Sequence, residues 1–283
     1  MGSEAAWRTA FQYWARQGCL TLRRCSYPSI DWRPVRSLIE ALTGLGRAQS
    51  QILKRLTDRS GRSFPHLGDP LRVDFGAHRW FRGQREESYS DWLAWLIGFL
   101  SPAEVLSTLG IGDKRLKRLC RGLRVAANRE EVMPADTEGD AGRFDLVIRF
   151  RDALVVLVEA KLRQGQPADR RQLKKYRAWL DGPEARDKRA VFLVPEAVSE
   201  PYPGWTVRRW ADVCVELRRV ASRMCRQEQT LPAAMTLAFV AAVEQNVLGF
   251  EALRPRTAPS PEPTLMNPRM IKHLEAFLAG VKR

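Results

Sequence analysis

Three residues near the middle of the chain have types and spacing that suit chemistry on a phosphate group. Asp145 stands in an alternating segment, 144–150, and Glu159 and Lys161 stand in a second, apolar segment, 154–161. Carboxylates are the usual protein ligands of hard cations such as Mg²⁺ or Mn²⁺. A neighbouring ammonium group can offset charge that develops on a phosphate. These residue types therefore predict a metal-assisted hydrolytic site.

The two segments bring these residues together only if they form a β-hairpin. The period-2 pattern and the short connection at 151–153 predict one. With a three-residue loop, Phe150 faces Leu154, and the same register sets Asp145 opposite Glu159, with Cβ atoms about 5 Å apart. A cross-strand salt bridge on a solvated sheet face would give the same pattern, and the hairpin alone leaves that alternative open.

The even-numbered positions of the hairpin form a wholly apolar face, which we expect to be the core face. The odd-numbered positions then hold the two carboxylates and Lys161 at one end of the other face. The even-numbered residues are Phe144, Leu146, Ile148, Phe150, Leu154, Val156, Val158 and Ala160.

Asp145, thirteen intervening residues and Glu159-Ala160-Lys161 resemble the D…(D/E)xK signature of the PD-(D/E)XK, or restriction-endonuclease-like, nuclease superfamily. Phe144 stands where that signature usually has a proline. The resemblance implies a metal-dependent nuclease that acts on nucleic acid, above all DNA, as in bacterial defence or DNA processing. Under it, Asp145 and Glu159 are metal ligands, and Lys161 positions the attacking water.

A helix expected over 84–100 resembles the opening helix of several bacterial families in this superfamily, which supplies a further metal-site acid. Two acids compete for that role. Glu86 lies 3, 7 and 14 residues before Tyr89, Leu93 and Leu100, so it shares the buried stripe of the helix, and we choose it. Glu87 points away from that stripe and is expected only to favour the helix N-terminus.

The helix expected after Lys161 carries Gln172 and Tyr176, which resemble the QxxxY motif of some branches of the superfamily. A spacing of four places both side chains on one helix face. The resemblance implies that they contact phosphate or brace the site. A tyrosine packed in the core beside a solvated glutamine is the alternative.

Two basic segments flank these residues in the sequence, at 114–124 and 163–177. Phosphate neutralisation is the expected role of such segments, although a solvated helix face would look the same. The candidate nucleic-acid-binding residues are Lys114, Arg115, Lys117, Arg118, Arg121, Arg171, Lys174 and Lys175.

The order of elements predicts an α/β protein with a restriction-endonuclease-like core, in which helices flank a central mixed sheet. We expect a mainly helical region at 1–83, the core with its following helices at 84–253, a proline-rich linker at 254–268 and an amphipathic helix at 269–283. Helices are expected at 4–17, 35–57, 84–100, after Ser101-Pro102, 113–126, 167–180, 211–226 and 232–248. Strands are expected at 144–150, 154–161, 190–195 and 206–209.

Composition narrows the class of partner. Lys and Arg number 47 against 32 Asp and Glu, a net charge of +15, which favours a polyanionic partner. The longest apolar stretch, 231–243, is too short to span a bilayer, and no leader or anchor pattern is visible, so we expect a cytoplasmic protein without a membrane. The C-terminal helix should dock on its own chain or on a neighbour, as in a homo-oligomer.

The cysteines and histidines give little support for a disulfide framework, a zinc site or a histidine-based catalytic site. The five cysteines form no CxxC pair, which argues against a disulfide framework or structural zinc, and His66, His78 and His273 are expected to be structural or surface groups. Two rival functions remain. One is a catalytically inactive nucleic-acid-binding or assembly module with the same fold, and the other is a basic helical adaptor in which the hairpin is incidental.

Overall fold

The computed structural model describes residues 33–73, 86–132, 143–163, 170–181, 186–196, 202–250 and 268–281. The helix expected at 4–17 and positions 254–267 of the linker lie outside these ranges. The chain divides into two units, Met1–Leu45 and Gly46–Arg283. The helix α2 (Arg33–Gly61), expected at 35–57, runs through this division, so residues 46–73 of the expected N-terminal region pack into the second unit.

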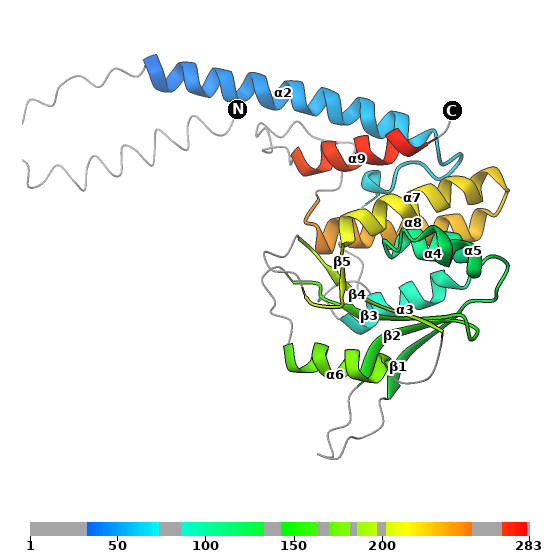
Figure 1. Ribbon diagram of the computed structural model, residues 1–283. Helices are drawn as coiled ribbons and strands as arrows, with labels where there is room; N and C mark the ends of the chain where they lie inside the picture. Colours follow the sequence, from blue (N-terminus) through cyan, green and yellow to red (C-terminus); the bar gives the residue numbers. More distant parts are fainter. Residues whose placement is uncertain are drawn as a thin grey trace, which may run out of the picture. The chain divides into compact units, whose positions relative to one another are not determined.

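The second unit contains a five-stranded mixed sheet in the order β1-β2-β3-β4-β5 (Figure 1). The first three strands are antiparallel neighbours, and β3, β4 and β5 run parallel. This confirms the α/β class and the mixed sheet. The strands are β1 (Ala126–Val132), β2 (Arg143–Phe150), β3 (Leu154–Ala160), β4 (Asp187–Val194) and β5 (Thr206–Arg209).

The expected register of the hairpin is confirmed. Phe150 pairs with Leu154, and the ladder between β2 and β3 runs to the pair of Leu146 and Val158. Asp145 and Glu159 lie one position beyond that last pair. A short loop and a buried face on each strand explain why the pattern alone could set this pairing.

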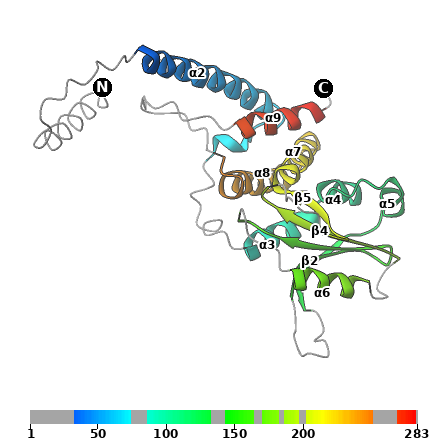
Figure 2. The ribbon, with the colours of Figure 1, turned by 60° about the vertical axis from the view of Figure 1, so that its left-hand side comes forward.

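Helices pack on both faces of the sheet (Figure 2). Most match the expected segments, and the 3₁₀ turn and the π-helix were not expected. The helical elements after α2 are η1 (Pro70–Arg72), α3 (Glu86–Ile97), α4 (Pro102–Thr108), α5 (Lys114–Leu119), α6 (Arg170–Leu180), α7 (Trp210–Arg226), α8 (Thr230–Ala242), the π-helix η2 (Val243–Val247) and α9 (Pro268–Gly280).

Only one face of the hairpin was expected to be buried, and this is wrong, because both faces are. The even-numbered residues from Leu146 onward pack with α3 and α7 in the main core. On the other face, Val147, Val155 and Leu157 pack against Leu173 of α6 in a second core. The cause is the parallel connection from β3 to β4, whose helix α6 covers the odd-numbered face.

Phe144 also departs from the expected even-numbered face. Its ring lies 4.7 Å from the ring of Tyr176 and 4.5 Å from that of Trp179, both on α6. It stands beyond the last ladder pair of the hairpin, although it still pairs with Glu131 of β1.

The basic helix expected at 113–126 is shorter, and the strand β1 that follows was not predicted. Asp113 caps the start of α5 with hydrogen bonds from the N–H groups of Arg115 and Leu116. After Cys120 the chain reverses at Gly122, whose φ of +74° suits glycine. The sequence of β1, AANREEV, has little strand propensity, and its pairing with β2 explains why it is extended.

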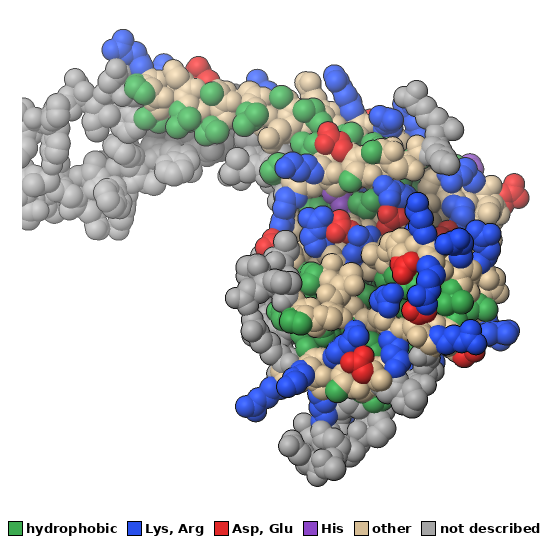
Figure 3. Space-filling model, viewed as in Figure 1, with side chains coloured by type: hydrophobic (Ala, Val, Ile, Leu, Met, Phe, Trp, Pro, Cys, Tyr) green, Lys and Arg blue, Asp and Glu red, His purple; other side chains and the backbone are tan. Residues whose placement is uncertain are grey.

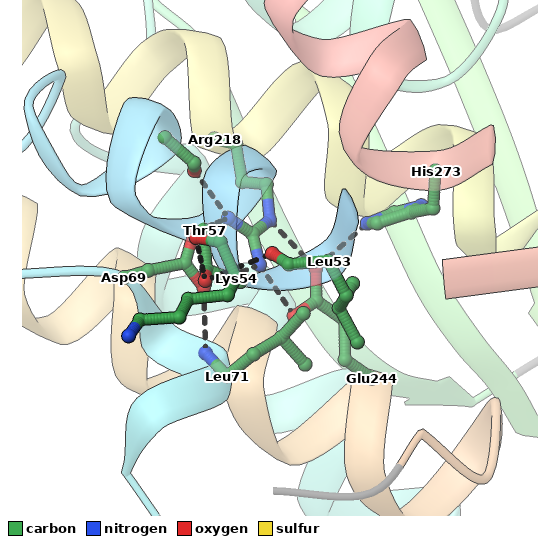
Figure 4. A network of polar contacts seen from close by, with 9 residues as sticks. Leu53, Lys54, Thr57, Asp69, Leu71, Arg218, Glu244 and His273 are labelled. Carbon is green, nitrogen blue, oxygen red and sulfur yellow. Dashed lines mark hydrogen bonds and ion pairs between the residues drawn. The ribbon is translucent and has the colours of Figure 1, made fainter. Parts of the chain in front are cut away.

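The C-terminal helix α9 docks on its own chain, which is one of the two outcomes that we expected, the other being a neighbouring chain. Met270, Leu274, Phe277 and Leu278 are buried. A buried polar network joins α9 to the rest of the unit (Figure 4), since His273 contacts Glu244, which accepts two hydrogen bonds from Arg218. Within the ranges that the structure describes, no helix has the length and apolar character needed to cross a membrane.

Candidate active site

Asp145 and Glu159 meet at the end of the hairpin where β2 begins and β3 ends. The N–H of Ala160 donates to Oδ2 of Asp145 at 2.8 Å, and this bond takes the place of a further ladder bond between the two strands. The two carboxyl groups interact closely enough for each to shift the pKa of the other. Glu159 is only 2% exposed, so the alternative of a salt bridge on a solvated face is excluded.

Lys161 joins this acid pair to the helix α3. Its Nζ atom lies 2.9 Å from Oε1 of Glu159 and 3.3 Å from Oε2 of Glu86. Its side chain is 12% exposed and that of Glu86 is 26% exposed, so solvent reaches the group from the Glu86 side. Three predicted site acids, Glu86 of α3, Asp145 of β2 and Glu159 of β3, therefore gather around the ammonium group of Lys161.

The acid pair is electrostatically unusual. Burial, and then the negative charge of Asp145, raises the pKa of Glu159 to about 8, against the opposing effect of Lys161. Burial also raises the pKa of Asp145, although the hydrogen bond from Ala160 lowers it. At neutral pH the pair therefore holds a proton that two exposed carboxylates would release.

Burial lowers the pKa of Lys161, but the carboxylates of Glu159, Glu86 and Asp145 outweigh that effect and raise it above its ordinary value. The side chain is consequently a permanent cation at neutral pH. It can donate hydrogen bonds to an anion, but it cannot serve as a base.

One atom of the site lacks a partner. Oε2 of Glu159 is buried, and no group in the described part of the chain donates a hydrogen bond to it. A buried carboxylate oxygen without a donor is costly, and its neighbour is another carboxyl group. The proton that the pair retains at neutral pH, or a cation in its place, would stabilise this oxygen. In the described part of the chain, however, no three His, Cys, Asp or Glu side chains form a group ready to hold a metal ion.

The positions of Glu86 and Glu87 on α3 show which of the two acids reaches the site. Tyr89, Leu93 and Leu96 are buried in the main core, and Glu86, at the start of the same stripe, turns inward to Lys161. Glu87 is exposed, and its carbonyl accepts a hydrogen bond from Arg129. The choice of Glu86 from helix periodicity agrees with these positions.

Gln172 and Tyr176 lie on one face of α6, as expected from their spacing. The amide of Gln172 donates to the hydroxyl of Tyr176, and that hydroxyl donates to the carbonyl of Arg143. Arg143 is the first residue of β2, two positions before Asp145. The pair thus braces the strand that carries Asp145.

Trp210 is the first residue of α7 and lies buried in the main core, and it also takes part in the site. Its indole Nε1 donates to the carbonyl of Lys161 at 2.9 Å, while the N–H of Lys161 donates to the carbonyl of Leu193 at 2.8 Å. Both backbone groups of Lys161 are fixed in this way. Nothing in the sequence indicated this hydrogen bond.

The two basic segments lie at different ends of the sheet. The helix α6 begins beside the acid pair, and it carries Arg171 and Lys174 exposed and Lys175 half-buried. The helix α5 lies at the other end, because Arg115 pairs with Asp187 at the start of β4. The two segments flank the acid pair in the sequence, but in the structure only α6 begins beside it. The bases of the α5 segment, Lys114, Arg115, Lys117, Arg118 and Arg121, are remote from Lys161.

Comparison of the chain with protein-family models, with curated proteins and with solved structures found no match.

Proposed function

We propose that this protein is a metal-dependent nuclease that hydrolyses phosphodiester bonds of nucleic acid, with DNA as the first substrate to test. The observation that carries the proposal is the buried acid pair of Asp145 and Glu159, held against the permanent cation of Lys161. A structural ion pair has no need of a second buried carboxyl group in contact with the first, because that group raises the cost of burial. Perturbed groups of this kind are typical of functional sites.

Each residue has a role that follows from its position. Lys161, fixed by Trp210 and Leu193 through its backbone, would donate to a phosphate oxygen and offset the charge that develops there. Glu86, on the solvent side of Lys161, would accept a hydrogen bond from the attacking water. Gln172 and Tyr176 would keep the start of β2, and hence Asp145, in place.

The residues fit a bound Mg²⁺ or Mn²⁺. Asp145 and Glu159 would hold it, with Glu86 directly or through water, and the buried Oε2 of Glu159 is a ligand atom that no donor occupies. Mg²⁺ is commonly bound through one or two carboxylates, with water and substrate phosphate completing its coordination. A preformed cage of three acids is therefore not required. When bound, the ion would polarise the phosphate and lower the pKa of a coordinated water.

The order of the elements also supports a restriction-endonuclease-like core. A helix that supplies an acid is followed by an antiparallel hairpin with the D…ExK residues at one end, and a crossover helix leads to a parallel strand. This arrangement agrees with the resemblance of the motif.

A cleavage assay tests the proposal. Linear, circular and single-stranded DNA and a structured RNA are incubated with the protein in Mg²⁺, Mn²⁺ or EDTA. We expect cleavage that requires the divalent ion, and the substrate that is cut identifies the nucleic acid. Lys161→Ala should reduce the rate of cleavage by at least about a hundredfold. Lys272→Ala, which removes an exposed lysine of α9, should leave the rate unchanged.

Two results would overturn the proposal. Cleavage that persists in Lys161→Ala would mean that another site or a contaminant does the chemistry. Binding of nucleic acid without cleavage in either ion would favour the inactive binding module.

A further inference from the structure

A second basic surface lies at the end of the sheet opposite the acid pair. Three segments meet there: the helix α5, the loop between β2 and β3, and the start of β4. The N–H groups of Arg186 and Asp187 donate to the carbonyls of Asp152 and Ala153, and Asp187 pairs with Arg115. These contacts fix the three segments relative to one another.

The surface is strongly cationic, and we call it the far-edge surface. Asp152 of the loop is exposed, and the other two acids are engaged, since Asp113 caps α5 and pairs with Arg189 while Asp187 pairs with Arg115. Lys and Arg side chains gather around α5 and the neighbouring strand ends (Figure 3). Its exposed bases are Lys114, Arg115, Arg118, Arg121, Arg151 and Arg186.

Five of these six bases have no carboxylate partner among the residues that the structure describes, Arg115 being the exception. An exposed basic group that forms no ion pair with these residues is available to neutralise an external anion. Five of the six are arginines, whose planar guanidinium groups match phosphate in a bidentate manner. A row of phosphates is the ligand that this chemistry suits.

The separation of the two surfaces indicates which nucleic acid they would share. The strand β3 runs from Leu154 at the far edge to Ala160 at the acid pair, and six residues of strand span about 20 Å. In duplex DNA this length corresponds to about six base pairs, at about 3.4 Å each. A duplex is stiff over this distance, whereas a single strand would have to be ordered along it.

We propose that the far-edge surface binds the phosphate backbone of double-stranded nucleic acid at a point about six base pairs from the bond at the acid pair. The stated distance to the bond that is cleaved rests on the proposed nuclease function. The binding of a duplex to this surface does not depend on that function, because a chain without catalytic activity would still use the surface. The surface then anchors the substrate, while Lys161 and the acids act on it.

Binding of fluorescent 20-base-pair DNA, measured in EDTA over a range of salt concentrations, tests the inference. The variant carries Lys114→Ala, Arg118→Ala, Arg121→Ala and Arg151→Ala. Since each lost phosphate contact reduces the slope of log K against log salt by about 0.9, we expect a loss of about 2 to 4 in the slope. The thermal midpoint should stay unchanged, because these side chains are exposed and form no ion pair with the residues that the structure describes.

A matched control removes the same charge elsewhere in the second unit. Lys54→Ala, Arg55→Ala, Arg59→Ala and Arg62→Ala alter four exposed bases in and just after α2. This control should keep the slope within about 1 of the wild-type value. A single-stranded 20-mer and vesicles that contain phosphatidylserine serve as alternative polyanions, and the far-edge substitutions should affect binding to the duplex more than binding to either.

The outcomes separate the two proposals. An unchanged slope in a protein that still cleaves DNA would overturn the far-edge surface and leave the nuclease intact. A reduced slope in a protein that never cleaves would retain the surface and reject the nuclease. Equal losses with the single strand, or a larger loss with the vesicles, would overturn the assignment to a duplex.

Discussion

The indole of Trp210 donates a hydrogen bond of 2.9 Å to the backbone carbonyl of Lys161. Trp210 is the first residue of α7 and is fully buried, whereas Lys161 directly follows β3. The bond therefore ties the end of a central strand to the start of a core helix. Because the N–H of Lys161 is also engaged, the direction in which its side chain leaves the backbone is fixed.

Trp210→Phe keeps an aromatic ring in the core and removes this donor. We expect the rate constant kcat of cleavage to fall by about tenfold or more, since small displacements of a catalytic group are costly, while KM changes little. Steady-state kinetics on an oligonucleotide substrate measures both. Trp205→Phe is the control, because Trp205 packs near Phe192 on the other face of the sheet. A Trp210→Phe enzyme with wild-type kcat would show that the bond has no positioning role.

The acid pair predicts an unusual dependence of stability on pH. The pKa of Glu159 is about 8 in the folded chain and about 4.3 for an ordinary glutamate. Between these values the folded chain keeps a proton that the unfolded chain has lost. Stability contributed by this group therefore decreases as the pH rises from about 4.5 to about 8.

Glu159→Gln removes that titration and retains the shape of the side chain. In EDTA, the melting temperature of the variant minus that of the wild type should increase steadily between pH 4.5 and pH 8 and then level off. Differential scanning calorimetry checks this, with Glu275→Gln on the exposed face of α9 as the control. A difference that does not vary with pH would contradict the shifted pKa.

Some of this structure could be predicted from the sequence, and the limits have physical causes. The register of the hairpin and the inward direction of Glu86 follow from local periodicity, because a short loop and a buried helix stripe leave few alternatives. The strand β1 could not be predicted, since its extended form depends on pairing with β2. The hydrogen bond from Trp210 to Lys161 joins residues 49 positions apart, and no local pattern encodes it.

The buried network around Arg218 is a second case of long-range order. Arg218 is fully buried, and it donates to Glu244, to Asp69 and to Ser60. Ser60 of α2, Asp69 directly before η1 and Glu244 of η2 thus meet at the guanidinium group of Arg218, and His273 of α9 contacts Glu244 beside it (Figure 4). Sequence alone indicated α7 as an amphipathic helix, and an arginine at its centre gave no sign of its partners.

This network predicts a loss of stability in acid. Burial raises the pKa of Glu244, but Arg218 and His273 outweigh it and lower the value to about 2. The folded chain then holds a carboxylate where the unfolded chain is protonated. The stabilisation is present above about pH 4.5 and is lost as the pH falls toward 2, and it is on the order of 3 kcal/mol.

Urea unfolding at pH 7, 4.5, 3 and 2 measures this dependence. Wild-type protein should lose more stability below pH 4.5 than Glu244→Gln, which is less stable at pH 7 because Arg218 keeps only one carboxylate partner. Glu228→Gln, at an exposed turn, should follow the wild type. Equal acid sensitivity in Glu244→Gln and wild type would rule out this network as the source.

The last prediction concerns the divalent ion itself. A ligand that binds only the folded chain stabilises it by mass action, and Mg²⁺ at about 100 times its Kd adds about 2.7 kcal/mol. For a unit of this size that free energy corresponds to a rise of about 5 to 10 °C in the melting temperature. Asp145→Asn should remove most of this rise, because it deletes one of the two charges that attract the ion. In EDTA the same variant should be slightly more stable than the wild type, since the repulsion with Glu159 is relieved.

The proton held by the acid pair makes this prediction sharper. With a Glu159 pKa of about 8, binding of the ion at pH 7 must displace a proton. Apparent affinity should therefore increase by up to about tenfold per pH unit between pH 6 and pH 8. Isothermal titration calorimetry in two buffers of different ionisation enthalpy should detect the release of about one proton. A melting temperature that Mg²⁺ raises equally in Asp145→Asn, or binding that releases no proton at pH 7, would place the ion elsewhere on the protein.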